Sequence, residues 1–130
     1  MIRGSNVEFR FKLPYPFSEL ATVNVVFWQD GYDGPSPGRP LPIKKNKNHC
    51  RVGRNDTELS VVLQREETLR FTDKRKGKVQ LFAETFSGID VCGLEQLFPV
   101  YPSKDGDEFT GGVIESPDGD YLVLFDGRPI

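Results

Sequence analysis

A short stretch near the N-terminus alternates strictly between apolar and charged residues, and this pattern restricts the fold more than any other feature. Val7, Phe9, Phe11 and Leu13 are apolar, and the residues between them are charged. Successive side chains of a β-strand point to opposite faces, so the pattern predicts a strand that buries one face. The later apolar runs are not separated by helical segments of about 10–15 residues, which argues against alternating β–α architectures.

Further short apolar runs follow at turn-bounded spacings of about 8–12 residues, as in two-sheet β proteins. The segments predicted as strands are 23–30, 51–52, 58–64, 78–87, 88–92, 97–101 and 121–125. Segment 65–71 contains better helix formers, and we expect one or two helical turns there. The sequence therefore predicts an all-β fold: an antiparallel β-sandwich with an Ig-like two-sheet architecture and one short helical turn around 65–71.

Alternation within the predicted strands also indicates the core. The predicted core residues are Phe9, Phe11, Val25, Phe27, Leu59, Val61, Leu63, Val79, Leu81 and Val123. We expect Trp28 in the core as well, because it lies in a strand predicted to be central. In the helical turn we expect Leu69 and Phe71 to pack against the sheet, while Glu66 and Glu67 face water.

The length of 130 residues is that of one domain, and we interpret residues 1–130 as a single β-sandwich domain. Segment 31–48 is rich in Pro and Gly and then becomes basic, so we expect a loop there. Segment 103–130 is expected to be a C-terminal extension with a hairpin, for which Asp118-Gly119 is a typical turn.

Composition and hydropathy argue against several classes of protein. No apolar run approaches the roughly 20 residues that span a bilayer, and the first residues lack the continuous apolar region of a secretory signal. We therefore expect no secretory signal peptide and no membrane partner. The formal net charge is −2, whereas dedicated nucleic-acid binders are usually basic, so the sequence disfavours a nucleic-acid partner.

Few residues are available for catalysis or metal binding. Cys50 and Cys92 are the only cysteines and His49 is the only histidine, and no CxxC or HxxxH spacing supplies further zinc ligands. We expect free thiols, with their pairing left open, and no catalytic, metal or cofactor-binding residues, so the protein is not expected to be an enzyme. One alternative stays open: five carboxylates lie in the predicted turns at 105–108 and 118–120, and calcium prefers oxygen-rich loops.

Charge is distributed unevenly along the chain. Residues 1–80 contain 15 basic and 9 acidic residues, a net charge of +6, whereas residues 81–130 contain 2 and 10, a net charge of −8. A basic patch on one molecule could meet an acidic patch on a neighbour, and heterologous contacts of this kind can close rings. The residues that form our candidate interaction surface are Lys74, Arg75, Lys76, Tyr32 and Arg39.

Four short motifs follow one another in a recognisable order. They are Arg3-Gly4-Ser5, Phe11-Lys12-Leu13-Pro14-Tyr15, Phe27-Trp28-Gln29 and Gln64-Arg65-Glu66-Glu67-Thr68-Leu69. Across residues 2–102 the chain resembles small proteins encoded in prophages of Firmicutes, often among tail and structural genes, which show RGTTP-like, FxLPF, VxFxQ and LTQEETL motifs. The chain departs from that pattern at Arg65, in its long Pro-rich loop and in the sixteen residues that follow Gly112-Val113-Ile114.

The resemblance implies a phage structural or accessory role, with no activity or catalytic residues to transfer. Together with the uneven charge, it leads us to expect a non-enzymatic protein located in the bacterial cytoplasm or in the virion, with the tail or baseplate as a candidate place of action. Its expected partners are copies of itself or other phage structural proteins. The alternative is a small carbohydrate- or host-surface-binding module that uses exposed aromatic residues, for which Trp28, Tyr32 and Tyr101 are the candidates.

Overall fold

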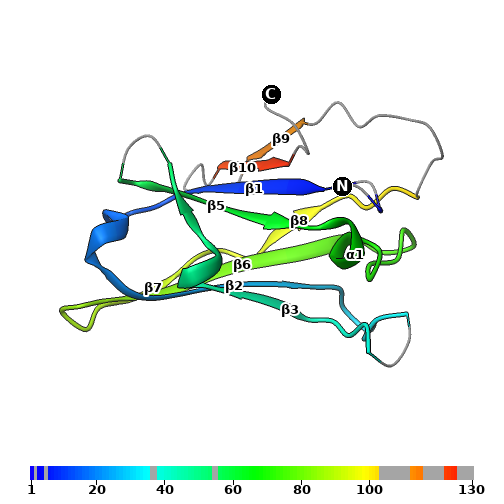
Figure 1. Ribbon diagram of the computed structural model, residues 1–130, viewed down its shortest axis with the longest axis horizontal. Helices are drawn as coiled ribbons and strands as arrows, with labels where there is room; N and C mark the ends of the chain where they lie inside the picture. The colour runs from blue at the N-terminus through cyan, green and yellow to red at the C-terminus, as the bar shows by residue number, and fades with distance from the viewer. Residues whose placement is uncertain are drawn as a thin grey trace.

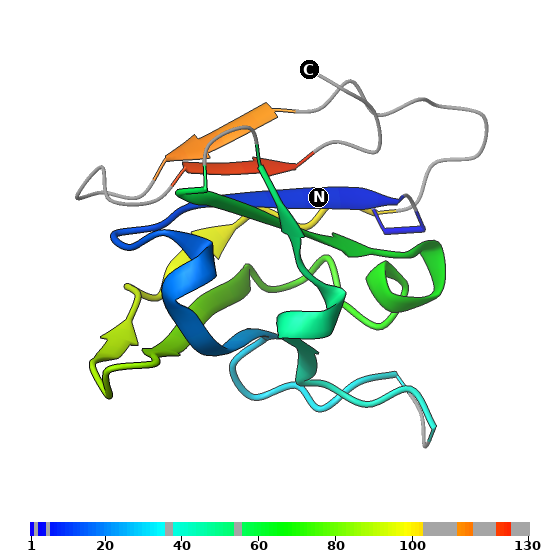
Figure 2. The ribbon, with the colours of Figure 1, turned by 60° about the vertical axis from the view of Figure 1, so that its left-hand side comes forward.

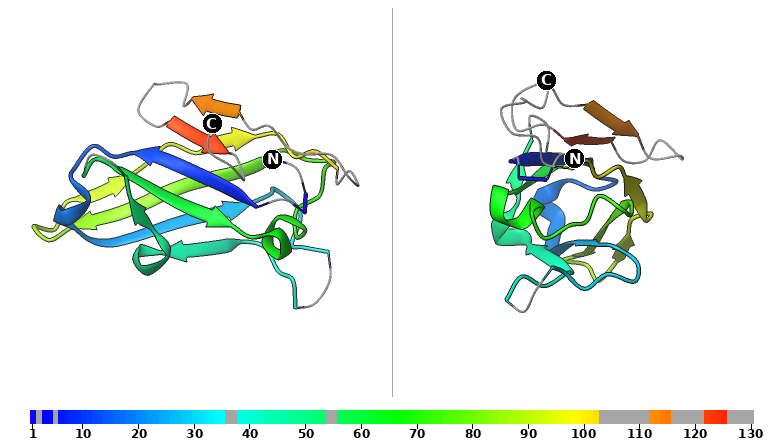
Figure 3. Two further views of the ribbon diagram at one scale, coloured as in Figure 1. Left: turned by 45° about the horizontal axis from the view of Figure 1, so that its top comes forward. Right: turned by 90° about the vertical axis from the view of Figure 1, so that its right-hand side faces the viewer.

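Two antiparallel sheets lie face to face and enclose one hydrophobic core (Figure 1). The computed structural model describes residues 1–102, apart from residues 2, 5, 36–37 and 54–55, together with the strands at 112–115 and 122–125. In the end-on view of Figure 3 the sheets form two separate layers. The prediction of an all-β sandwich is therefore confirmed.

The smaller sheet has three strands and the larger sheet has five. The smaller contains β1 (Val7–Lys12), β4 (Arg51–Val52) and β5 (Glu58–Leu63), in the order β1–β5–β4. The larger contains β2 (Leu20–Trp28), β3 (Ile43–Asn46), β6 (Gly77–Thr85), β7 (Asp90–Cys92) and β8 (Gln96–Phe98), in the order β3–β2–β6–β7, with β8 also paired to β6. A hairpin of β9 (Gly112–Glu115) and β10 (Leu122–Phe125) has β10 beside β1 (Figure 1).

Short helical segments carry the chain from one sheet to the other (Figure 2). The 3₁₀ helix η1 (Phe17–Glu19) links β1 to β2, η2 (Lys47–His49) lies between β3 and β4, and α1 (Arg65–Thr68) lies between β5 and β6. The Glu67 carboxylate caps the start of α1, because its Oε1 accepts a hydrogen bond from the Gln64 backbone N–H at 3.0 Å. The helical turn predicted at 65–71 is confirmed, but it ends at Thr68.

Phenylalanine rings join the two sheets across the core. Phe9 of β1 contacts Phe27 of β2 at a centroid separation of 4.9 Å and Phe98 of β8 at 5.1 Å, both edge to face. Phe98 also contacts Phe71, at 5.9 Å. Nine of the ten predicted core residues are at most 1% exposed, which confirms the alternation argument; the side chain of Val123 lies outside the described part of the chain.

Segment 31–48 is not entirely a loop, which corrects the sequence prediction. Residues 43–46 form strand β3, which pairs with β2 so that Ile43 lies opposite Phe27. Only one apolar residue, Ile43, marks this strand, and the lysines that follow it give no alternation. The strand forms because β2 offers it a row of backbone hydrogen-bonding groups and because Ile43, 5% exposed, reaches the core.

Two side chains lie in an environment other than the predicted one: Trp28 was expected in the core and Glu67 was expected to face water. Trp28 is not in the core: it lies on the outer face of β2 and is partly exposed. Val23, Val25 and Phe27 take the inward positions of that strand, so Trp28 points outward. Glu67 does not face water either, because its Oε2 forms an ion pair with Lys45 Nζ at 2.7 Å, with both side chains at most 15% exposed.

Candidate binding groove on the five-stranded sheet

The outer face of the five-stranded sheet carries a strip of apolar side chains between polar rows. Along β2 the outward positions include Val26 and Trp28, and along β6 they include Gln80 and Phe82. The pairing of the two strands places Val26 opposite Gln80. Phe82 is 38% exposed although it stands in the middle of β6, so this part of the sheet is uncovered.

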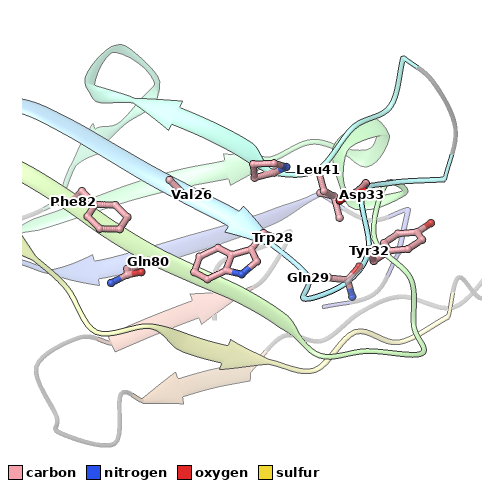
Figure 4. Close-up of a pocket in the computed structure, with 9 residues that line it drawn as sticks. Val26, Trp28, Gln29, Tyr32, Asp33, Leu41, Gln80 and Phe82 are labelled. Atoms are coloured by element: carbon pink, nitrogen blue, oxygen red, sulfur yellow. The ribbon is translucent and has the colours of Figure 1, made fainter.

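A groove of about 330 Å³ opens on this face where β2 runs into the Pro- and Gly-rich loop (Figure 4). Its lining residues are Val26, Trp28, Gln29, Tyr32, Asp33, Leu41, Pro42, Gln80 and Phe82. Aromatic and aliphatic surfaces predominate, while Gln80 and Asp33 add polar groups. Such a combination is typical of ligand-binding and protein-binding surfaces.

The orientation of the Trp28 ring is fixed by neighbouring charges. Trp28 Nε1 donates a hydrogen bond to Asp30 Oδ1 at 3.1 Å. The other oxygen, Asp30 Oδ2, forms an ion pair with Lys78 Nζ, which also lies 3.2 Å from Glu95 Oε2. These bonds, first the one from Lys78 and then the one from Trp28, lower the pKa of Asp30. The carboxylate therefore stays charged at neutral pH and holds the indole in place.

A buried glutamine joins the two turns at this end of the sheet. Gln29 is 3% exposed, and its Nε2 donates to the carbonyl oxygens of Thr72 at 2.8 Å and Arg75 at 2.9 Å. Its Oε1 accepts the Thr72 backbone N–H at 2.8 Å. All the hydrogen bonds of this amide are to backbone groups, so the rim of the groove is held by the fold itself.

The predicted interaction residues are partly brought together. Arg75 Nη1 donates to the Asp30 carbonyl oxygen at 2.7 Å, next to the turn that carries Tyr32, and Tyr32 forms one wall of the groove. Lys74 and Lys76 are exposed on either side of Arg75. Arg39 is also exposed, but it does not line the groove; its charge instead contributes to lowering the pKa of Glu66, after the larger effects of Arg70.

Phe82 was not among the predicted site residues, and Trp28 was named only as an aromatic candidate of the carbohydrate-binding alternative. Trp28 was assigned to the core. The signal that could have found it is positional: Trp28 stands one residue out of phase with Val25 and Phe27, and only one phase of a strand faces the core.

A second hollow, of about 530 Å³, lies on the outside of the three-stranded sheet. Its lining residues are Glu8, Arg10, Arg51, Val52, Gly53, Glu58 and Ser60. The lining contains two acidic and two basic side chains, and Arg10 Nη2 lies 3.3 Å from Glu8 Oε1. The charges of this hollow balance one another, so it selects neither an anion nor a cation.

Metal ligands do not gather in the described part of the chain. Within it, no group of three or more His, Cys, Asp or Glu side chains is placed to hold an ion. Cys50 and Cys92 are free thiols, and burial raises the pKa of Cys50 to about 11. The acidic turns at 105–108 and 118–120, with the calcium alternative, lie outside the described residues.

No helix within the described ranges has the length and apolar character required to cross a membrane.

Comparison of the chain with the sequence models of known protein families gives no match, and comparison with curated proteins gives none either.

Proposed function

We propose that the protein is a non-enzymatic structural or accessory component of a phage or prophage, associated with the tail or baseplate, that acts by binding other proteins. It would work in the bacterial cytoplasm or in the virion. The observation that supports this most strongly is the series of exposed apolar side chains between β6 and β8 of the five-stranded sheet, because exposed apolar surface marks interaction sites.

Exposed apolar residues come mainly from one part of the chain. Seven large apolar side chains among the described residues are exposed. Five of them lie between positions 82 and 97, on β6, on β8 or in the connections before and after β7: Phe82, Phe86, Ile89, Leu94 and Leu97. The fixed ring of Trp28 lies in the same sheet, and rigid tryptophan and tyrosine side chains often dominate the energetics of protein interfaces.

The first and the last of the motifs that resemble prophage proteins belong to the scaffold, whereas Phe27-Trp28-Gln29 contributes Trp28 and Gln29 to the groove. Gly4 N–H donates to Thr68 Oγ1 at 2.9 Å, and Arg65 Nη1 donates to the Gly4 carbonyl oxygen at 3.2 Å. The Arg-Gly motif near the N-terminus and the motif at α1 therefore contact each other, although about sixty residues separate them.

The direct test is co-purification with candidate partners. The protein is co-expressed with each product of the tail and structural genes that flank its own, and the complexes are isolated through a tag on the partner. We expect one of these products to retain the wild-type chain and to lose the Phe82→Lys variant. The matched control is Val52→Lys, which places the same charge at a similarly exposed position, 49% exposed, on the other sheet. Retention of both variants alike, or of neither protein by any partner, would contradict the proposal.

A second candidate, a carbohydrate- or host-surface-binding module, is favoured by the contents of the groove. Trp28 and Tyr32 present aromatic surfaces beside the amide of Gln80 and the carboxylate of Asp33 (Figure 4). A glycan array probed with the wild-type chain and with Tyr32→Ala tests it. Specific glycan binding that is lost in Tyr32→Ala, with no protein partner found, would replace the assembly proposal.

A further inference from the structure

We propose that Phe86, on the turn between β6 and β7, inserts into the groove of a second copy of the chain, so that copies join head to tail. The inference rests on the proposed function, because it names the occupant of one protein-binding site on the same sheet. It is carried by a phenylalanine exposed on a fixed turn, by an apolar groove at the far end of the sheet, and by opposite excess charge around the two.

Phe86 is the most exposed large apolar side chain in the described part of the chain, at 73%. Hydrogen bonds hold the turn that carries it: the Phe86 backbone N–H donates to the Glu19 carbonyl oxygen at 3.0 Å, and the Ile89 backbone N–H donates to Thr85 Oγ1 at 3.0 Å. Ile89 itself is 46% exposed. A side chain presented on a fixed turn loses little backbone freedom on binding, so it suits insertion into a partner.

The groove has the size and the lining that such a side chain needs. Its volume is about 330 Å³, whereas a cavity of about 150 Å³ already holds a benzene molecule. The ring of Trp28 is fixed by Asp30, and Tyr32 and Leu41 line the same groove (Figure 4). A phenylalanine ring would therefore meet aromatic and aliphatic surfaces, which favours edge-to-face or offset contacts.

Phe86 of a chain does not reach the Trp28 end of its own groove. Trp28 lies opposite Lys78 at the start of β6, and Phe86 follows the end of that strand. At about 3.3 Å per residue, the strand separates the two by about 25 Å. Figure 1 shows the β6–β7 turn and the turn that leads into β6 at opposite ends of the molecule. The contact is therefore one between molecules.

The rim of the groove carries an excess of positive charge. Asp30 and Glu95 are already paired with Lys78. Lys74 and Lys76, on the turn before β6, are exposed and form no ion pair within the described part of the chain. The charged side chains of the rim are six basic and four acidic ones: Arg39, Lys44, Lys74, Arg75, Lys76 and Lys78 against Asp30, Asp33, Asp73 and Glu95.

The turn that carries Phe86 has the opposite excess charge. Glu19, Glu84 and Asp90 flank it, all exposed and without an ion pair among the described residues. Glu84 and Asp90 lie directly opposite each other on paired strands, where like charges repel. Lys47 offsets one of the three, because its Nζ lies 5.4 Å from the centre of the Phe86 ring. Lysines at the groove rim of a neighbouring copy would relieve the remaining repulsion, so charge favours the same pairing as the apolar contact.

Such a contact is heterologous, because one end of each copy meets the other end of the next. It can repeat, and the copies then form a ring if the rotation between neighbours closes and an open chain if it does not. A turn inserted into a groove buries less than the roughly 1,200 Å² of a standard interface, so we expect weak association of the purified chain.

Sedimentation velocity of the purified chain, up to about 1 mM in about 0.1 M salt, measures this association. We expect species larger than a dimer as the concentration rises, and less association in about 1 M salt, where the Debye length falls from roughly 10 Å to roughly 3 Å. Phe86→Ala and Tyr32→Ala should each raise the dissociation constant about tenfold or more, as at the centre of an interface. The matched control is Leu97→Ala, which removes another large apolar side chain, 48% exposed, from the same sheet and should leave the constant unchanged.

Mixing the two variants tests the direction of the contact. Phe86→Ala keeps an intact groove and Tyr32→Ala keeps an intact turn, so each mixed pair has one complete contact. We expect the equimolar mixture to form dimers with the dissociation constant of the wild-type contact and to stop at the dimer, because its free ends lack either the ring or the groove wall. Cooperative urea unfolding of each variant establishes that it folds.

A chain that remains monomeric at about 1 mM would overturn this inference, and so would association that Phe86→Ala leaves unchanged. A mixture that associates no more tightly than its separate components would overturn it as well. Glycan binding by a monomeric chain, lost in Tyr32→Ala, would assign the groove to a carbohydrate instead. None of these results decides whether other phage structural proteins bind, which co-purification tests; failure of co-purification alone would leave the head-to-tail contact in place.

Discussion

Replacing Phe9 by alanine should remove the contact that links the two sheets most directly. Phe9 is fully buried, and its ring meets Phe27 of the facing sheet at 4.9 Å and Phe98 at 5.1 Å. Both partner rings are themselves held in the core, with Phe27 fully buried and Phe98 1% exposed. The cavity should therefore stay largely open.

We expect Phe9→Ala to lower the free energy of unfolding by about 3–5 kcal/mol, the usual cost of deleting a buried phenylalanine ring. The two edge-to-face contacts account for about 0.5–1.5 kcal/mol each within that total. Since domains of this size are stable by only about 5–15 kcal/mol, the loss is a large fraction of the stability.

Urea unfolding at neutral pH, followed by Trp28 fluorescence and by circular dichroism, measures the effect. The matched control is Phe86→Ala, the same change at a side chain that is 73% exposed. Its ring contacts only the Lys47 ammonium, at 5.4 Å, among the interactions described, so its removal should cost less than about 1 kcal/mol. A loss below about 1 kcal/mol for Phe9→Ala, or equal losses for the two variants, would show that the Phe9 ring does not stabilise the packing of the two sheets.

Three further outcomes follow from packing and charge. Gly77→Ala should destabilise the fold by about 1–3 kcal/mol in urea unfolding, because a Cβ at this position would lie 2.2 Å from the Phe98 ring; an unchanged midpoint would contradict that. In a carboxyl ¹³C NMR titration the pKa of Asp30 should lie below its ordinary value of 3.8, and this pKa should rise in the Lys78→Met variant. The same pKa of Asp30 in both chains would exclude the ion pair. Burial lowers the pKa of the Met1 amine from 8.0 to about 5. Between these pH values the unfolded chain binds more protons than the folded chain, so the free energy of unfolding should rise with pH across this range. A urea midpoint that falls as the pH rises would contradict this prediction.

The main strands could be predicted because each of them buries one face. Alternation at Val7–Lys12 and Glu58–Leu63 gave β1 and β5 nearly to the residue. Strand β2 begins at Leu20, three residues before the predicted start, because its first residues alternate less clearly. These strands are specified by local pattern, since the period of two assigns every second side chain to the core.

The remaining features depend on contacts between distant residues. Strand β3 contains one core residue, Ile43, and exists through its pairing with β2. Glu67 is shielded from water by Lys45, which is 22 residues away and on another element. The groove likewise combines Trp28 with Phe82 of a different strand. No local pattern encodes such pairs, so the sequence could predict the sandwich but not the shape of its outer face.

We infer that the outer face of the five-stranded sheet is the binding surface of this protein. Amide chemical shifts of the ¹⁵N-labelled protein, recorded across a dilution series and again with any partner that co-purifies, report directly on the face that is covered. We predict shift changes that concentrate at the amides of Asn24, Val26, Gln80 and Phe82 and that are absent from the same spectra of Phe82→Lys. Shift changes confined to β1, β4 and β5, or none at any concentration and with any partner, would contradict the assignment.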